Sequence, residues 1–320
     1  MTEEREMLRR TVAALVDRHA PPDAVRRAMS SDRGYDESLW ALLCEQVGAT
    51  ALVVPEEFGG AGGELADAAV VFEELGRALV PTPLLGTTLA EMALLAADAP
   101  DAAALERLAG GGVVGALVFD PDHVVHGDVA DIVVAVRQGR IERWTQVVAE
   151  PLTPLDPTRR LARLRPGRTE VIGSDPGLAA TAAMLMAAEQ VGAAARCLQL
   201  TVDYTKQRVQ FGRPIGSFQA LKHRMADLYV CVQSARAVLA EAIADPGATT
   251  AALARLAATE TFCAVAGEAI QMHGGIAITW EHDIQLYFKR AHTSAQLLDP
   301  PAQALRHLES QVLQRYSRER

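Results

Sequence analysis

Arg208-Val209-Gln210-Phe211-Gly212-Arg213-Pro214-Ile215, with Gly216-Ser217-Phe218-Gln219 directly after it, is the stretch around which this chain is organised. It separates two long helical patterns, which cover residues 179–207 and 218–244. Gly212 and Pro214 mark the break, because glycine tolerates left-handed backbone angles and proline disfavours helix in the residue before it. We expect Ser217 to cap the second helix through its hydroxyl group.

Helical periodicity dominates both ends of the chain. In the N-terminal part it predicts helices over residues 3–20, 38–46, 67–79 and 85–96, with a glycine-rich loop at residues 55–63. In the C-terminal part it predicts four helices over residues 177–207, 218–244, 249–271 and 281–313. Long helices with short connections indicate an antiparallel bundle.

The middle of the chain has a different character. Short valine-rich segments at residues 113–119, 122–126, 132–137 and 144–150 are separated by turn residues, and residues 161–164 and 170–172 add two more strands. Gln138-Gly139-Arg140 fits a hairpin turn. We therefore predict a mainly α fold with a small central β domain: an N-terminal helical domain (1–110), a reduced β domain (111–175) and a C-terminal helical bundle (176–320).

Composition limits the classes of function. The net charge is −9 and there is no basic block, which argues against nucleic acid as the main partner. No apolar run has the length of a membrane span, and the charged start of the chain is unlike a signal peptide. The four cysteines are scattered and show no metal-ligand spacing, which is typical of a reducing compartment. We expect a cytoplasmic protein without a metal site.

Three motifs resemble those of the acyl-CoA dehydrogenase family. The opening stretch matches the Arg-x-x-Phe-Gly signature of that family. Gln271-Met272-His273-Gly274-Gly275 matches a second motif, and residues 54–62 together with Phe72-Glu73-Glu74-Leu75-Gly76 match a third in the helical domain. The three motifs occur in the family's order over about two thirds of the chain, which is far more specific than a lone glycine pattern.

The resemblance implies a role in binding FAD. In the family, residues matching Arg208, Gln210, Phe211, Gln271, Gly274 and Gly275 meet the ADP half of an FAD that belongs largely to the neighbouring subunit. A guanidinium can grip pyrophosphate in two places, and glycine lets backbone approach a dinucleotide closely. Taken singly, Arg208, Gln210 and Phe211 are more simply interpreted as ordinary helix-end residues, and it is the run as a whole that points to the cofactor.

The resemblance also implies a catalytic glutamate at one of two positions, which correspond here to Ala182 and Leu298. Neither side chain can accept the proton α to a thioester. Two acids lie nearby in the sequence: Glu189, about two helical turns after Ala182, and Asp299, next to Leu298. For Glu189 an ion-paired or solvated role is the simpler interpretation, and for Asp299 a turn or helix cap.

The family usually has a larger middle barrel, whose Thr-Glu-Pro and Gly-Ser-Asp loops hold the flavin ring, and we expect both loops to be missing here. The chain is thus similar to the small subunits of actinobacterial heterotetrameric acyl-CoA dehydrogenases of steroid catabolism. This implies an α2β2 complex with a longer partner, a shared FAD, a steroid-derived acyl-CoA substrate, an electron-transfer flavoprotein-like acceptor and an inactive isolated chain. The alternatives are a self-sufficient homo-oligomeric dehydrogenase using Glu189 or Asp299, and a non-enzymatic scaffold subunit.

Overall fold

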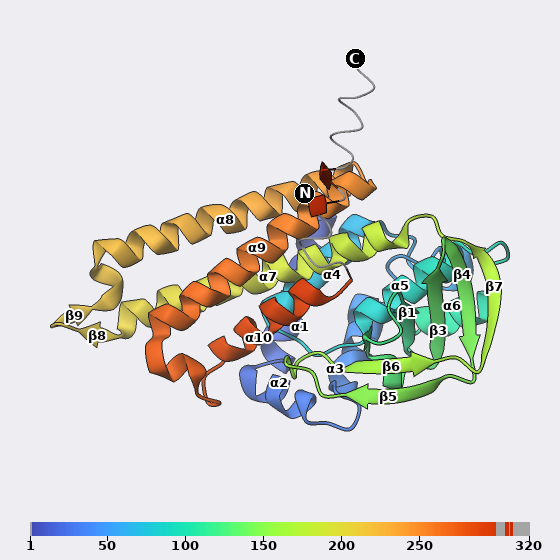
Figure 1. The fold of residues 1–320 in the computed structure, drawn as a ribbon, viewed down its shortest axis with the longest axis horizontal. Coiled ribbons are helices and arrows are strands. Elements are labelled where there is room, and N and C mark those ends of the chain that lie inside the picture. Colours follow the sequence, from blue (N-terminus) through green and yellow to red (C-terminus); the bar gives the residue numbers. More distant parts are fainter. Residues whose placement is uncertain (1, 299–304, 307, 310–320) are drawn as a thin grey trace, which may run out of the picture.

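A computed structural model describes residues 2–298, 305, 306, 308 and 309. The N-terminal helices are α1 (Glu3–His19), α2 (Pro22–Met29), α3 (Glu37–Leu42), α4 (Leu65–Arg77), α5 (Leu84–Leu95) and α6 (Ala102–Ala109). The C-terminal helices are α7 (Leu178–Gln207), α8 (Gln219–Ala244), α9 (Ala248–His273) and α10 (Ile284–Gln296). Figure 1 shows α7, α8 and α9 reaching out from one end of the molecule, with most of the β strands at the other. The predicted mainly α fold with a small β region is confirmed.

The N-terminal half contains two short helices that were not predicted from the sequence. Helix α2 begins at Pro22, where a proline is tolerated because the first helical N–H has no intrahelical partner. Helix α6 is capped by Asp101, whose carboxylate accepts a hydrogen bond of 3.1 Å from the backbone N–H of Ala104. The predicted helix over residues 38–46 is present as α3, which continues into a π-helical turn, Leu43–Val47.

Helices α4 and α7 cross at two glycines. A Cβ atom added to Gly76 of α4 would lie 2.1 Å from the carbonyl oxygen of Glu189, and one added to Gly192 of α7 would lie 1.9 Å from the carbonyl oxygen of Glu73. Any larger residue would push the helices apart. The Phe72–Gly76 motif therefore contains a packing residue that joins the two helical parts of the chain.

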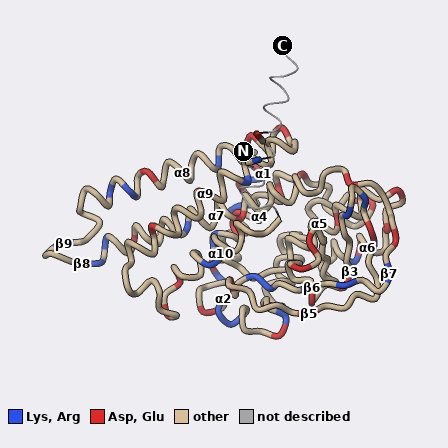
Figure 2. Tube along the Cα trace, in the orientation of Figure 1, with Lys and Arg blue, Asp and Glu red and all other residues tan. Residues whose placement is uncertain are grey.

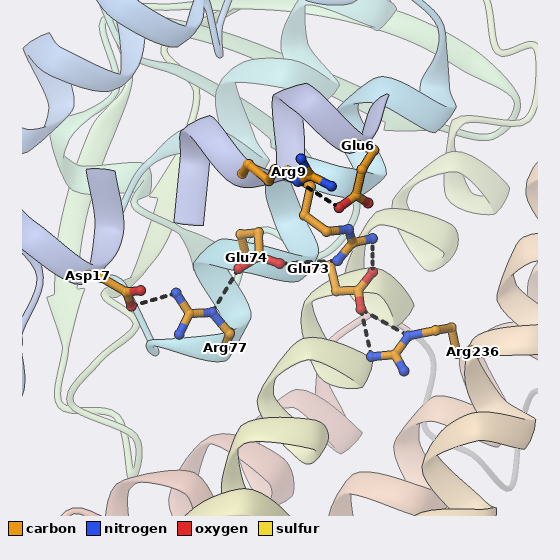
Figure 3. Close-up of polar contacts among 8 residues, drawn as sticks. Glu6, Arg9, Asp17, Glu73, Glu74, Arg77 and Arg236 are labelled. Carbon is orange, nitrogen blue, oxygen red and sulfur yellow. Dashed lines mark hydrogen bonds and ion pairs between the residues drawn. The ribbon is translucent and has the colours of Figure 1, made fainter. Parts of the chain in front are cut away.

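The same motif supplies the carboxylates of a charged network (Figure 3). Arg9 of α1 bridges Glu73 at 2.8 Å and Glu74 at 3.1 Å. Arg236 of α8 donates from Nε and Nη2 to one oxygen of Glu73, at 3.0 and 2.8 Å. Burial alone would raise the pKa of Glu73, but the two guanidiniums outweigh it and hold that pKa below its usual value. The network ties α1, α4 and α8 together.

The β region consists of two small sheets. One has the order β1 (Gly115–Val118), β3 (Ile132–Arg137), β4 (Arg140–Thr145) and β7 (Arg168–Ser174), in which only β1 and β3 pair in parallel. The other has the order β2 (Val124–Val125), β6 (Leu161–Arg165) and β5 (Val148–Leu152). The predicted hairpin turn is confirmed, with Gln138 and Gly139 both at positive φ. The predicted strand over 144–150 is divided between β4 and β5, and that over 122–126 is only two residues long.

Helix α7 lies at the centre of the C-terminal bundle. It is long and apolar enough to cross a membrane by composition, but 72% of its most apolar window is buried inside the protein. Helix α8 packs on the bundle with a single face, which consists of Leu228, Val232, Ala235, Leu239 and Ala242. The opposite face of α8 carries exposed side chains, among them Tyr229 and Val230.

The prediction of a fourth long helix over residues 281–313 was wrong. Helix α10 ends at Gln296, Leu297 is extended, and Leu298 has a φ of 67°. The guanidinium of Arg255 donates to the carbonyl oxygens of Ser294 and Leu297, at 2.5 and 3.2 Å, which holds the chain in this non-helical path. Asp299 lies outside the described residues.

Candidate functional site

The stretch that begins at Arg208 forms a β-hairpin where only a helix break was expected. Strands β8 (Val209–Gln210) and β9 (Arg213–Pro214) pair in antiparallel fashion. The two turn residues between them, Phe211 and Gly212, have φ values of 54° and 75°. Phe211 is 91% exposed, so its ring is presented to the surroundings and not to the core. The predicted cap of α8 by Ser217 is wrong, because the N-cap residue is Phe218 and no side chain caps the helix.

Arg208 combines a fixed backbone with an open side chain. Its N–H donates to the carbonyl of Tyr204 at 2.9 Å, and its own carbonyl accepts from the N–H of Ile215 at 2.8 Å. The guanidinium is on an exposed residue and forms no hydrogen bond or ion pair with the described part of the chain. Gln210 is exposed in the same way. Arg208 is therefore available to an anion from outside this chain.

This end of the bundle is electropositive although the whole chain is acidic. Between Asp203 and Asp227 the sequence contains no acid and five cationic residues, namely Lys206, Arg208, Arg213, Lys222 and Arg224. Figure 2 shows this concentration of Lys and Arg around the β8–β9 hairpin and the start of α8. Of these five cations, only Arg224 forms an ion pair with a residue that the structure describes, namely Glu268 at 3.0 Å. Such a surface attracts phosphate groups.

The second motif exposes backbone at the end of α9. Gln271 is exposed on the last turn of that helix. Gly274 has a φ of 65° and a ψ of −148°, a conformation that in practice only glycine adopts. A Cβ atom on Gly274 or Gly275 would meet nothing within 4 Å, so the backbone here is open to an approaching group.

One contact brings the two motifs to the same end of the bundle (Figure 1). The ring of Tyr204, four residues before Arg208, stacks on that of His273 with centroids 4.2 Å apart, and its hydroxyl donates to the carbonyl of His273 at 3.3 Å. Gly274 follows His273 directly. The arginine and the open glycine backbone, which are far apart in sequence, therefore lie on one cationic surface.

One of the two expected base positions, Leu298, lies at a small cavity without a suitable acid among the described residues. Leu298 lines a cavity of about 80 Å³ together with Met186, which lies one helical turn after the fully buried Ala182. The nearest ionisable groups, Asp120 and His123, pair with each other at 2.8 Å, and both are more than half exposed. Pockets that hold a cofactor or drug-sized ligand measure roughly 300–1,000 Å³. This cavity cannot seat a flavin ring as it stands.

Glu189 lies in a different environment. Its carboxylate accepts from Arg159 at 2.5 Å and from Arg290 at 3.1 Å, and only 12% of its side chain is exposed. Burial alone would raise the pKa of Glu189, but the two guanidiniums outweigh it and lower that pKa. It lines a separate cavity of about 20 Å³. A carboxylate so paired is a poor proton acceptor, which favours the structural interpretation of Glu189.

Comparison with known proteins agrees with the motifs. The family model for the acyl-CoA dehydrogenase N-terminal domain matches residues 2–111, and that for the acyl-CoA dehydrogenase C-terminal domain matches residues 153–297. The chain belongs to the acyl-CoA dehydrogenase family. It is 70% identical over 310 residues to the acyl-CoA dehydrogenase IpdE2 of Mycobacterium tuberculosis, over 97% of this chain and 98% of that protein.

Two solved structures share this fold. A variant of the steroid ACAD Tcur3481-Tcur3483 superposes with a TM-score of 0.91 at 23% identity, covering 98% of this chain and 99% of the other. A chain of the ChsE4-ChsE5 complex from Mycobacterium tuberculosis superposes with a TM-score of 0.88 at 24% identity, covering 98% of each chain. At these identities the likeness concerns the fold alone.

The tripeptide Gly-Ser-Asp, which we expected to be missing, occurs once in this sequence, at the junction between the β region and α7. Gly173-Ser174-Asp175 does spell Gly-Ser-Asp, at the end of β7. The carboxylate of Asp175 accepts from the N–H groups of Gly177 and Leu178, at 3.0 and 2.9 Å, and so closes the turn into α7. This tripeptide acts as a helix start in this acyl-CoA dehydrogenase chain. The sequence contains no Thr-Glu-Pro loop.

The buried group that surrounds Glu189 was not predicted from the sequence. Arg159 and Arg290 are both buried, and Arg290 pairs with the buried Asp156 at 3.1 Å. His126 lines the same small cavity, is buried, has a φ of 51°, and neither ring nitrogen has a hydrogen-bond partner within the described residues. Burial, assisted by the neighbouring arginines, lowers the pKa of His126 to about 3. The apolar context of Glu189 was the one sequence signal that buried partners had to exist.

Proposed function

We propose that this chain is a subunit of an FAD-dependent acyl-CoA dehydrogenase, that it completes the FAD site of a longer partner subunit, and that it has no catalytic base of its own. One juxtaposition carries the proposal. The FAD-contact motifs form an open cationic surface at the bundle end, while of the two base positions Ala182 is fully buried and Leu298 lines a small cavity without a suitable acid among the described residues. A self-sufficient active site would need both the surface and the acid.

The residues of the cationic surface fit the ADP half of FAD. The guanidinium of Arg208 would bind the pyrophosphate, Gln271 would offer its amide, and the open backbone at Gly274 and Gly275 would admit the dinucleotide closely. Gln210 and the exposed ring of Phe211 would contact the same half of the cofactor. FAD, when bound, accepts a hydride from the β carbon of the acyl group. The base that removes the α proton would come from the partner.

A partner is also supported by exposed apolar surface. Tyr229 and Val230 on the outer face of α8 are 58% and 61% exposed, and Phe211 lies beyond the start of the same helix. Neighbouring exposed apolar residues, such as Tyr229 and Val230, are a feature of many interfaces. We infer an α2β2 assembly in the cytoplasm, a steroid-derived acyl-CoA substrate and an electron-transfer flavoprotein-like acceptor. Among the solved relatives, ChsE4-ChsE5 is a complex and Tcur3481-Tcur3483 is a steroid ACAD, and both support this choice.

We propose for this subunit the three-domain division predicted from sequence, 1–110, 111–175 and 176–320. Both alternative functions face a structural objection. A self-sufficient enzyme using Glu189 must release that carboxylate from two arginines. A scaffold that never meets a flavin leaves two features without a purpose: Arg208, which is unpaired within the described residues, and the glycine-only backbone of Gly274.

The test is FAD retention by the assembled complex. The chain is co-expressed with its longer partner, and bound FAD is measured after serial dilution for wild type and for Arg208→Ala. Loss of a charge-assisted hydrogen bond should cost about 1.5–3 kcal/mol, which corresponds to roughly 10- to 150-fold weaker binding. Arg224→Ala, which removes an ion-paired cation from the same surface, is the matched control. Wild-type FAD affinity in the Arg208→Ala complex would refute the assigned role.

A further inference from the structure

A further cavity, of about 210 Å³, lies apart from the two described above. Its lining includes no residue of the FAD-contact motifs and neither base position. Its walls come from the ends of α1 and α4, the starts of α2 and α10, and the middle of α7. One water molecule needs roughly 10–15 Å³ of such space, so there is room for a small organic molecule. Cavities between packed helices are common ligand sites.

The wall carries two acids, Asp17 and Asp283, and two arginines, Arg77 and Arg196, and three of these four groups have an ion-pair partner. Asp17 pairs with Arg77 at 2.7 Å, and Asp283 pairs with Arg26 of α2 at 2.7 Å. Arg196, which projects from α7 into the lining, has no hydrogen bond or ion pair with any residue that the structure describes. One half-buried guanidinium is therefore left over, and it favours a ligand with a single negative charge.

The rest of the wall is largely apolar, with Val25, Leu79, Leu200 and Leu286 among the lining residues. Leu79 is unusual because it follows the end of α4 with a φ of 52°, a position and conformation where glycine is the common choice. A leucine at this point is strained, and the side chain that it keeps there is 2% exposed and lines the cavity. Backbone strain of this kind gathers at ligand sites.

We propose that this cavity binds a small aliphatic carboxylate, with the carboxylate on Arg196 and the alkyl chain against Leu79 and Leu200. An inorganic anion would pair with the guanidinium of Arg196 but would leave the apolar wall uncovered. A neutral aliphatic molecule would cover the apolar wall but would leave Arg196 unpaired. The site is independent of the FAD-contact surface, so it stands or falls separately from the proposed role in the dehydrogenase.

The first test uses calorimetric titration and thermal unfolding of the full chain with three probes. Hexanoate supplies both features, hexanamide lacks the charge, and inorganic phosphate lacks the alkyl chain. We expect hexanoate to bind and to raise the melting temperature, and the other two probes to bind at least 10-fold more weakly. No binding of hexanoate, or equal binding of phosphate, would overturn the proposal.

The second test assigns the binding to this cavity. Arg196→Gln should weaken hexanoate binding at least 10-fold, while Arg27→Gln should leave it unchanged, because Arg27 is an exposed residue of α2 outside the lining. Leu200→Asn, at a half-buried wall position, should weaken hexanoate binding several-fold. This variant tests the assignment if Arg196→Gln does not fold. Hexanoate affinity that is the same in these wall variants as in wild type would place the binding elsewhere and refute the assignment.

Discussion

Replacing Glu189 by glutamine tests whether this acid is a structural ion or a hidden catalytic base. Glutamine has nearly the same shape but no charge, so the substitution removes the ion pairs with Arg159 and Arg290 without opening a cavity. Arg159 would keep its hydrogen bond to the hydroxyl of Ser294, and Arg290 its pair with Asp156. Two buried guanidiniums would then share one carboxylate.

The expected loss of stability is large. Removing one partner of a buried pair costs about 3–5 kcal/mol, because it leaves an uncompensated charge. That is a substantial part of the roughly 5–15 kcal/mol that holds a domain folded. Glu268→Gln is the matched control, since its pair with Arg224 has side chains 36% and 54% exposed and is worth no more than about 1 kcal/mol.

Urea unfolding at pH 7, followed by circular dichroism, measures both variants against wild type. We expect the free energy of unfolding of Glu189→Gln to fall by about 3–5 kcal/mol with little change in the slope against urea, and that of Glu268→Gln to fall by less than about 1 kcal/mol. Equal, small losses in the two variants would show that Glu189 is not the centre of a buried charge network.

Enzyme activity tests the remaining possibility, which is that Glu189 acts as the catalytic base. At a temperature where the Glu189→Gln complex is folded, turnover per bound flavin should stay within a few-fold of wild type, because the carboxylate is held by arginines and faces no substrate-sized cavity. Loss of a general base lowers the rate by at least about 100-fold. A drop of that size with full flavin content would make Glu189 the base after all.

Three further predictions concern acid sensitivity, helix packing and the expected base position at Leu298. The pKa of His126 is about 3 in the folded chain and near 6.5 in the unfolded chain, so the unfolded chain binds the proton first as the pH falls. The free energy of unfolding should therefore fall by up to about 1.4 kcal/mol per pH unit below pH 6.5. Urea unfolding at a series of pH values should show a weaker pH dependence for His126→Gln than for wild type. Gly192→Ala should cost at least about 2 kcal/mol in thermal or urea unfolding, because its Cβ would lie 1.9 Å from the carbonyl oxygen of Glu73. Leu298→Glu should create no turnover in the isolated chain in a dye-reduction assay with acyl-CoA thioesters, because a cavity of about 80 Å³ has no room for a flavin ring, and robust turnover would contradict this.

Sequence pattern located the long elements well because their apolar periodicity and their stops are local. The end of α7 at Gln207 follows from the break that Gly212 and Pro214 impose. The hairpin inside that break was missed because it places Phe211 at a positive φ, a conformation that propensity assigns to glycine. The end of α10 was missed because it depends on Arg255, which lies on another helix.

The residues of the candidate site were predicted from motifs and remain a prediction, and their arrangement could not be predicted from the sequence. The motifs name Arg208 and Gly274, yet their meeting depends on the stacking of Tyr204 on His273, and nothing in either motif predicts that contact. For Glu189 the pattern indicated only that an acid on an apolar helix needs partners, without saying which. Those partners, Arg159 and Arg290, come from a loop before β6 and from α10.

The network around Glu189 also fixes the segment that leads to Leu298, one of the two expected base positions. Arg159 donates to the hydroxyl of Ser294 at 2.8 Å, and Arg255 donates to the carbonyl of Leu297, so the segment that leads to Leu298 is fixed by groups on other parts of the chain. Glu189 neutralises Arg159 and thereby stabilises this arrangement. The Glu189 carboxylate is thus committed to holding Arg159 and Arg290 in place. Under the proposed function, such a chain would keep the surfaces that assembly with a partner needs and would leave the catalytic acid to that partner.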